Sequence, residues 1–262
     1  MSQSNPIHIA ILDLYDGSAN VGMDCIMDII EDWSKKQSLT IITTVFDVRV
    51  QNALPDDGFD LYLSSGGPGS PIDTQKEPWD IAYCNWLDQM FAQKKPVLLI
   101  CHSFQIACRH FNIGKVGLRK SKQLGILPIH PTADHAIFEA LPDPFFALES
   151  RMYQITEPND EKIESMGATI IALEKIRPQL PYERALMGVA FSDKMIGVQF
   201  HPEATKERLS TYFNTDAIKS AVVEDFSEDK WNQIIQSLEE DSKIKHTCSR
   251  FIPNFLNQML PV

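Results

Sequence analysis

A cysteine, a histidine and a glutamate supply side chains of the types that cleave amide bonds. Cys101 follows the apolar residues 97–100, and His201 and Glu203 follow a second apolar run. A thiolate attacks a carbonyl carbon, a histidine takes and returns the proton, and a carboxylate orients the imidazole. Because alternate residues of a strand share a face, His201 and Glu203 project in roughly the same direction. Together these three residues predict hydrolysis by a cysteine nucleophile; for His201 taken alone, the alternative is a histidine whose hydrogen bonds are satisfied in the core.

Cys101 lies where a buried strand is expected to turn sharply into a helix. The apolar residues 96–100 precede it, and Ile106, Ala107 and Phe111 continue a helical pattern after it. A parallel strand buried on both faces has this apolar character, and a sharp turn at its end exposes the residue there. The helix N-terminus favours the thiolate because its free N–H groups carry partial positive charge. The alternative is a cysteine buried at the end of a core strand.

Two further motifs accompany this turn. The loop GGPGSP at residues 66–71 follows an apolar strand, and the segment FHPE occupies residues 200–203. Glycine and proline clusters mark many turns, and no lysine follows Gly69 at the spacing of a phosphate-binding loop. In this order, GGPGSP, Cys101 with a glutamine four residues later, and FHPE resemble the class I glutamine amidotransferases. The resemblance covers roughly residues 7–205 and is to a stand-alone amidotransferase domain similar to that of GMP synthase.

The resemblance implies a reaction and its participants. Cys101, with His201 and Glu203 as the other members of a catalytic triad, would hydrolyse the side-chain amide of glutamine, or of a related γ-glutamyl amide. The reaction would pass through a cysteine thioester and release ammonia for an acceptor. No synthetase domain is apparent in the chain, so a separate synthetase subunit would supply the acceptor if one is used. No cofactor and no metal are expected.

Other site residues are carried over from the same resemblance. The backbone N–H groups of Gly67 and His102 would form the oxyanion hole, for which glycine allows close backbone approach. Gln105 matches the family glutamine that helps to position the substrate; the alternative is a polar residue on the exposed side of a helix. Ser150 and Arg151 stand where the family usually carries a Ser-His pair that grips the substrate backbone.

Three positions depart from the family pattern. The family turn usually reads Gly-x-Cys-x-Gly-x-Gln, whereas Leu99 and Ser103 occupy the two glycine positions here. Small residues there let the strand and the helix approach closely, and leucine is the larger change. Arg151 replaces the family histidine. These departures leave open an altered substrate or weak glutamine hydrolysis.

Two alternatives use the same residues differently. The adjacent Cys101 and His102 also resemble the DJ-1/PfpI-like cysteine hydrolases, in which Cys and His adjoin at the turn. That family does not account for FHPE or for the strands expected before it. The second alternative is a non-catalytic binding module whose site has decayed at Leu99 and Arg151. An assay of amide hydrolysis separates this module from an enzyme.

The composition is that of an ordinary globular protein. The 262 residues contain 44% hydrophobic and 23% charged side chains, and the net charge of −11 argues against a nucleic-acid partner. The five cysteines have no CxxC spacing and are interpreted as reduced thiols: Cys25, Cys84, Cys101, Cys108 and Cys248. The first residues lack the regions of a signal peptide, and no run of about 18 apolar residues could span a membrane. A cytoplasmic protein is therefore expected, with no membrane partner.

The elements expected along the chain predict an α/β fold. Strands are expected at 7–14, 39–48, 61–64 and 96–101, with helices at 20–36 and 79–93 between them. This alternation predicts a doubly wound, mostly parallel sheet with helices on both faces. Short added antiparallel strands are expected at 123–129, 145–149, 168–173, 185–191 and 195–200. Helices are expected at 205–213, 228–240 and 244–259, with Ser227 as the N-cap of the middle one. Residues 1–205 would form the amidotransferase-like domain, and 206–262 a helical C-terminal extension packed on it.

Overall fold

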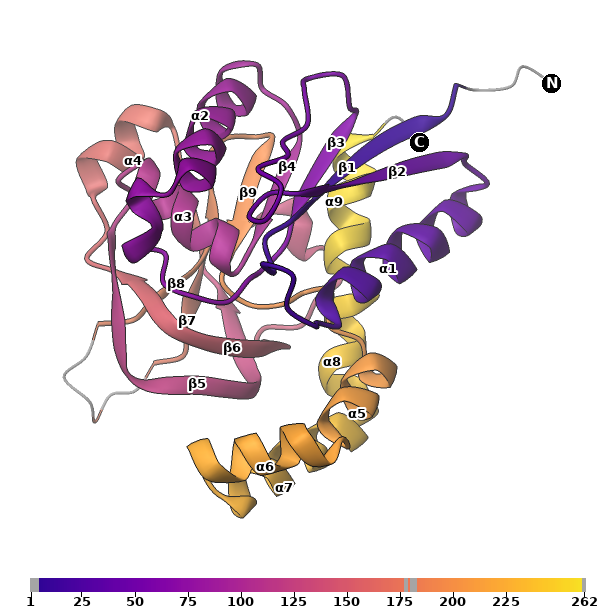
Figure 1. Cartoon of the computed structure of the whole chain (residues 1–262), viewed down its shortest axis with the longest axis vertical. Helices are drawn as coiled ribbons and strands as arrows, with labels where there is room; N and C mark the ends of the chain where they lie inside the picture. Colours follow the sequence, from indigo (N-terminus) through magenta and orange to yellow (C-terminus); the bar gives the residue numbers. More distant parts are fainter. Residues whose placement is uncertain (1–4, 177–178, 180–182, 261–262) are drawn as a thin grey trace.

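The computed structural model describes residues 5–176, 179 and 183–260, and a single mixed sheet forms the centre of this part of the chain (Figure 1). Its nine strands run in the order β2-β1-β3-β4-β9-β8-β7-β5-β6. The parallel part consists of β1 (Ile7–Asp13), β2 (Ile41–Asp47), β3 (Leu61–Ser64), β4 (Val97–Ile100) and β9 (Met195–Val198). Carboxyl ends of parallel strands meet at one edge, so the segments after β3, β4 and β9 lie close together.

An antiparallel part extends the sheet beyond β9. It consists of β8 (Leu186–Ala190), β7 (Thr169–Glu174), β5 (Lys115–Pro131) and β6 (Phe145–Thr156). The long strands β5 and β6 pair with each other, with an irregularity between Leu118 and Gln123. The helix α4 (Asp160–Met166) connects β6 to β7. This extension brings Leu148 of β6 against His201, which follows β9.

Alternate residues of β1 point into two separate cores. Ile9 and Ile11 pack with α1 (Gly22–Gln37) and α9 (Phe251–Met259) on one face of the sheet. Ala10 and Leu12 pack on the other face with α2 (Pro78–Ala92) and α3 (His102–His110). A strand that is buried on both faces has a largely apolar sequence, as β1, β3 and β4 have. The predicted α/β class, with helices on both faces and added antiparallel strands, is confirmed.

The chain after the last strand is helical, as predicted. Its helices are α5 (Lys206–Phe213), α6 (Asp216–Asp225), α7 (Glu228–Glu239), α8 (Asp241–Cys248) and α9. Ser227 caps α7 by accepting the Lys230 N–H at 3.1 Å. A third apolar cluster joins α5, α6 and α7 to Leu124 and Ile126 of β5. In Figure 1 these three helices lie at the lower end of the molecule, whereas α9 stands beside β1 and α1.

Several elements differ from the predicted ones. The helix expected at 244–259 is two helices, α8 and α9, and Pro253 occupies the first turn of α9, where proline is tolerated. The helices α4 and α6 were not predicted, and the 3-10 turns Asp73–Lys76 and Ala136–Phe138 were not predicted either. The strand β5 begins at Lys115 rather than at residue 123, because its polar first half is held by pairing with β6.

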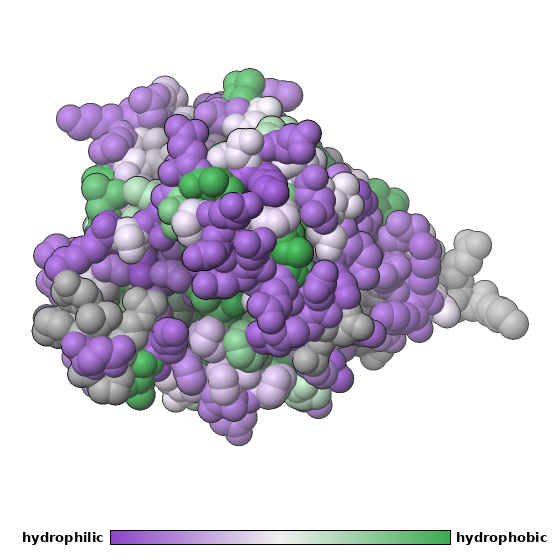
Figure 2. All heavy atoms as spheres, turned by 90° about the horizontal axis from the view of Figure 1, so that it is seen from below, coloured by the Kyte–Doolittle hydropathy of each residue, from purple (hydrophilic) through white to green (hydrophobic). Residues whose placement is uncertain are grey.

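The surface is largely hydrophilic where it can be seen from below (Figure 2). Apolar side chains reach that face as separate patches among hydrophilic ones. Within the described residues, no helix has both the length and the apolar character needed to cross a membrane. The same residues contain no group of three or more His, Cys, Asp or Glu side chains arranged to hold a metal ion.

Candidate active site

Cys101 occupies a strained turn between β4 and α3. Its φ of 51° and ψ of −97° lie in a region of backbone conformation that residues other than glycine rarely adopt. Its N–H donates to the Val198 carbonyl at 2.7 Å, and its carbonyl accepts the Gln105 N–H at 3.0 Å. The strand end and the first helical turn therefore fix this backbone from both sides. The predicted strand-to-helix turn is present, and the Cys101 side chain lines a pocket.

Ser103 braces this turn from a position where the family usually has glycine. Its Oγ accepts the Ile100 N–H at 2.8 Å and lies 3.0 Å from the Ser64 carbonyl, to which it can donate. The hydroxyl thus ties β4 to the end of β3. Leu99, the other departure, is fully buried in the core between the sheet and α2 and α3. The fold accommodates both side chains next to Cys101.

His201 and Glu203 form a close pair after β9. His201 Nδ1 lies 2.8 Å from Glu203 Oε1, and the Glu203 side chain is only 1% exposed. The His201 N–H donates to the Leu148 carbonyl at 2.9 Å, which anchors the histidine to β6. Burial lowers the pKa of His201, but the negative charges of Glu203 and of the Cys101 sulfur raise it more, so it lies well above its usual value. A protonated imidazole is therefore stabilised beside Cys101.

The glycine loop packs directly against this pair. A Cβ at Gly66 would lie 2.9 Å from His201 Cε1 and 3.5 Å from Cys101 Cβ. A Cβ at Gly67 would collide with the Leu14 carbonyl oxygen. Both glycines are required because backbone and ring approach too closely for a side chain. The loop, the cysteine and the histidine thus meet at one edge of the sheet, as the parallel strands predict.

Arg49 holds the loop in place, a role that sequence reasoning missed. Its Nη1 donates to the Pro68 carbonyl at 2.6 Å, and its Nη2 lies 3.1 Å from the Asp16 carboxylate. Its guanidinium also stacks 4.9 Å from the Trp79 ring centroid. No motif marks Arg49 in the sequence, because its partners are backbone carbonyls and distant side chains.

The His102 ring lies in a buried environment near the charged side chains of Arg49, Asp80 and Arg109. The side chain is 1% exposed, and its Nε2 has no hydrogen-bond partner within the described part of the chain. Burial lowers the pKa of His102 to about 4, and the positive charges of Arg49 and Arg109 add to this effect. The imidazole is therefore neutral at pH 7. Its backbone N–H begins α3 and has no acceptor within that helix.

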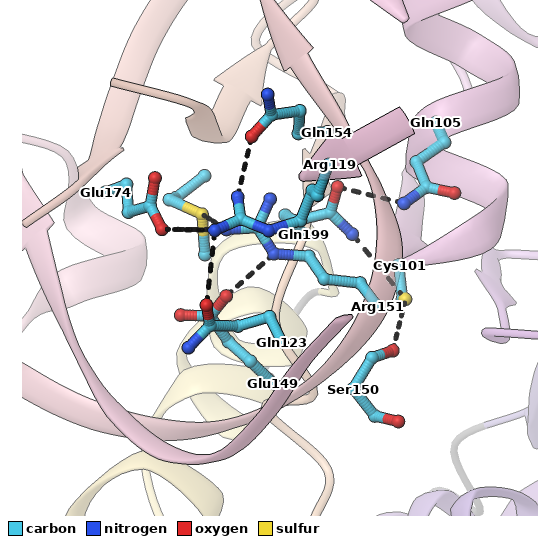
Figure 3. A network of polar contacts seen from close by, with 11 residues as sticks. Cys101, Gln105, Arg119, Gln123, Glu149, Ser150, Arg151, Gln154, Glu174 and Gln199 are labelled. Carbon is cyan, nitrogen blue, oxygen red and sulfur yellow. Dashed lines mark hydrogen bonds and ion pairs between the residues drawn. The ribbon is translucent and has the colours of Figure 1, made fainter. Parts of the chain in front are cut away.

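Two glutamines form a chain to the sulfur (Figure 3). Gln105 Nε2 donates to Gln199 Oε1 at 3.0 Å, and Gln199 Nε2 donates to Cys101 Sγ at 3.6 Å. Both side chains are buried. Gln199 was not predicted as a site residue, although its place directly after β9 and two residues before His201 gave a signal. Gln105 is thus linked to Cys101 through Gln199 and does not lie on an exposed helix face.

Ser150 and Arg151 diverge from each other. The Ser150 carbonyl lies 4.0 Å from Cys101 Sγ, at the outer limit of a sulfur hydrogen bond. The Arg151 side chain points away from Cys101 (Figure 3), and its Nε donates to Glu149 at 2.7 Å. Glu174, which also pairs with Arg119 at 3.1 Å, lies 3.4 Å from Arg151. Arg151 is thus held in a buried ion-pair network beneath the pocket.

The pocket beside Cys101 has a volume of about 500 Å³. His201, Glu203 and Gly67 line it together with Tyr15, whose phenol is near Glu203. Burial and the Glu203 carboxylate raise the pKa of Tyr15 well above its usual value, so the phenol stays protonated. The pocket therefore brings the Cys101 thiol and the His201–Glu203 pair together with the neutral phenol of Tyr15.

The other four thiols lie in environments that suppress the thiolate. Burial raises the pKa of Cys84 to about 12 and that of Cys248 to about 11. Burial also raises the pKa of Cys25, and it raises that of Cys108 well above its usual value. All five cysteines are unbridged.

The chain belongs to the class I glutamine amidotransferase family. The family model "Glutamine amidotransferase class-I" matches residues 27–220, which is most of the chain. This membership confirms the resemblance drawn from the three motifs. It also accounts for the FHPE segment, which the DJ-1/PfpI-like alternative left unexplained.

The chain is similar to several individual proteins. Anthranilate synthase component 2 of Lactococcus lactis subsp. lactis (strain IL1403) is 29% identical over 147 residues, which cover 55% of this chain and 65% of that protein. A glutamine amidotransferase from Thermotoga maritima matches with a TM-score of 0.71 and 16% identity over 98% of this chain and 99% of its own. A protein described as a GMP synthase subunit from Thermoplasma acidophilum matches with a TM-score of 0.53 and 19% identity. The match covers 84% of this chain and 98% of that protein. The two structures show likeness of fold.

Proposed function

We propose that this protein hydrolyses the side-chain amide of glutamine, or of a related γ-glutamyl amide, with Cys101 as the nucleophile. The main support is the 2.8 Å contact between His201 Nδ1 and Glu203 Oε1 beside a cysteine on a strained turn. A carboxylate that holds an imidazole next to a thiol is the arrangement that nucleophilic amide cleavage requires. Family membership supports the same activity.

The chemistry proceeds in two halves. The Cys101 thiolate attacks the amide carbon, a carbon–sulfur bond forms, and the carbon–nitrogen bond breaks as His201 gives a proton to the leaving nitrogen. Water then attacks the thioester and loses its proton to His201. The products are a carboxylic acid, the free thiol and ammonia. Glu203 keeps the imidazole oriented and stabilises its cation in both halves.

Donors for the developing oxyanion come from the backbone. The N–H of Gly67, on the loop that packs against His201, and the N–H of His102, at the start of α3, are the proposed pair. The helix N-terminus adds partial positive charge at the same place. Gln105 would act through Gln199, which holds the sulfur, and Ser150 would contact the substrate backbone.

The fate of the ammonia is a separate proposal. The Lactococcus lactis relative is named as one component of a synthase. By analogy, a synthetase subunit that accepts ammonia is the proposed partner of this chain. The unbridged cysteines favour a reducing compartment, which fits a cytoplasmic enzyme.

Two measurements on one protein test the activity. Wild-type protein should release glutamate from glutamine or from a small panel of γ-glutamyl amides, and Cys101→Ala should release none. At pH 7 a glutamine-like alkylating reagent should modify Cys101 and leave Cys25, Cys84, Cys108 and Cys248 unmodified, because burial disfavours their thiolates. Peptide mapping that found another cysteine modified first, or full activity in Cys101→Ala, would refute the assignment.

A further inference from the structure

The pocket beside Cys101 extends well beyond the reacting atoms to an apolar wall. That wall is formed by side chains of α5 and α6: Leu209, Tyr212, Phe213, Ile218 and Val222. Leu124 and Leu148 of β5 and β6 continue it toward the sheet. These helices follow the FHPE segment, so the same stretch of chain that delivers His201 also builds the far side of the pocket.

The wall is one edge of the third apolar cluster. Leu209, Phe213 and Val222 are almost fully buried in that cluster, whereas Tyr212 and Ile218 are only partly buried and border the pocket. Partly buried apolar side chains of this kind leave apolar surface for a ligand to cover. They line the same cavity as Cys101, so a substituent on a substrate held by Cys101 can extend toward them within that cavity.

Charged groups at this end of the pocket are paired with each other. Lys122 Nζ lies 2.5 Å from Asp225 Oδ2 and 5.8 Å from the centroid of the Phe226 ring. This half-exposed ion pair links β5 to the end of α6. Arg151, a further cation of the lining, is held by Glu149 beneath the pocket. The apolar wall is therefore not a site for a second charged group.

Glutamine alone does not match this cavity. A volume of about 500 Å³ lies within the range of roughly 300–1,000 Å³ that suits drug-sized ligands. Glutamine is smaller and, apart from a short methylene chain, entirely polar. Its amide nitrogen carries no group that could cover Tyr212 or Ile218.

We propose that the preferred substrate is a γ-glutamyl amide whose amide nitrogen carries an apolar group, which packs against Tyr212 and Ile218. This rests on the proposed function of Cys101 and specifies its substrate class. The bonds made and broken are those of amide hydrolysis: Cys101 Sγ bonds to the γ-carbon, and the carbon–nitrogen bond breaks. His201 protonates the leaving nitrogen, so an apolar primary amine departs in place of ammonia. Water then releases glutamate from the thioester.

A substrate series tests the wall directly. Release of glutamate is measured for glutamine and for the γ-glutamyl methylamide, butylamide, benzylamide and 2-methoxyethylamide. Each methylene buried on the wall should raise kcat/KM about fourfold. The butylamide should therefore exceed the methylamide at least tenfold, and it should exceed the 2-methoxyethylamide, which has the same length but a polar atom. Equal values for the butylamide and the 2-methoxyethylamide, or a highest value for glutamine, would overturn the proposal.

Two variants on one helix provide the matched comparison. Ile218→Ser should lower the ratio of kcat/KM for the benzylamide to that for glutamine by roughly tenfold. Val223→Ser changes an exposed apolar residue of α6 that does not line the pocket. Its kcat/KM values for the benzylamide and for glutamine should both stay at the wild-type level. An unchanged ratio in Ile218→Ser, with a folded protein by circular dichroism, would show that the wall does not contact the substrate.

One outcome separates this inference from the function on which it rests. If wild-type protein releases glutamate from glutamine but gains nothing from apolar substituents, the substrate class is wrong and amide hydrolysis stands. If no amide in the series releases glutamate, amide hydrolysis itself is wrong.

Discussion

The backbone of Cys101 stores strain in the folded protein, with a φ of 51°. Glycine adopts such a conformation without the steric cost that other residues pay, whereas alanine retains that cost. Both variants lack the sulfur, so they differ only in this steric cost. We therefore expect the free energy of unfolding of Cys101→Gly to exceed that of Cys101→Ala by at least about 1 kcal/mol. Urea denaturation of the two variants measures this difference. A more stable alanine variant would show that the turn is unstrained.

His102 should make the protein sensitive to mild acid. Its pKa is about 4 in the folded chain against 6.5 for an ordinary histidine, so only the unfolded chain binds the proton between these values. Stability is then unaffected above pH 6.5 and falls as the pH drops from about 6.5 to about 4. At about 1.4 kcal/mol per pKa unit, the loss is about 3 kcal/mol.

The variant His102→Gln tests this effect through its pH dependence rather than its absolute stability. The difference in unfolding free energy between wild type and variant should shrink by about 3 kcal/mol between pH 6.5 and pH 4 in urea titrations. If the difference in unfolding free energy stayed constant across this range, the His102 ring would be exposed to solvent and not buried.

At the scale of elements, α9 is part of the main core even though it is the last described helix. Phe251, Phe255 and Leu256 are fully buried against the sheet and α1. Phe255→Ala should lower the free energy of unfolding by about 3–5 kcal/mol, because it leaves a cavity in that core. Val223→Ala, on the exposed side of α6, should change it by less than about 0.5 kcal/mol. A similar small loss in both variants would mean that α9 packs loosely.

The strands that position the site could be predicted because their signals are local. Largely apolar runs mark β1, β3 and β4, and the GGPGSP loop follows directly after the end of β3. The helix α6 was missed because Val222 is its only buried residue, so it lacks an apolar stripe. The first half of β5 was missed because Lys115 to Lys122 is polar and gains its strand conformation from β6. Pro253 was the available signal for the start of α9.

The site residues show the same difference between local signals and contacts with distant partners. That Cys101, His201 and Glu203 lie together could be predicted because each belongs to a short motif at a strand end. Arg49 and the direction of the Arg151 side chain depend on partners far along the chain, and the sequence contains no sign of them. The catalytic roles of Cys101, His201 and Glu203 stay predictions, as does the domain division at residue 205. The predicted oxyanion-hole and substrate-binding roles also stay predictions; they concern Gly67, His102, Gln105, Ser150 and Arg151.

At the scale of the whole molecule, the pocket combines segments that are distant in sequence. The loop after β3, the turn after β4, the end of β9 and the helices α5 and α6 meet around one cavity. The parallel sheet gathers the first three, and the third apolar cluster adds the helices. The central claim is that this assembly makes His201, and not the neighbouring His102, the base for Cys101.

Steady-state release of glutamate by three variants tests that claim most directly. His201→Ala should lose at least about a thousandfold in kcat/KM, as loss of a base in a coupled unit does. His102→Ala should retain most of the activity because its backbone N–H survives, and Glu203→Gln should fall between them. Circular dichroism confirms folding of each variant. An inactive His102→Ala together with a nearly wild-type His201→Ala would contradict the account.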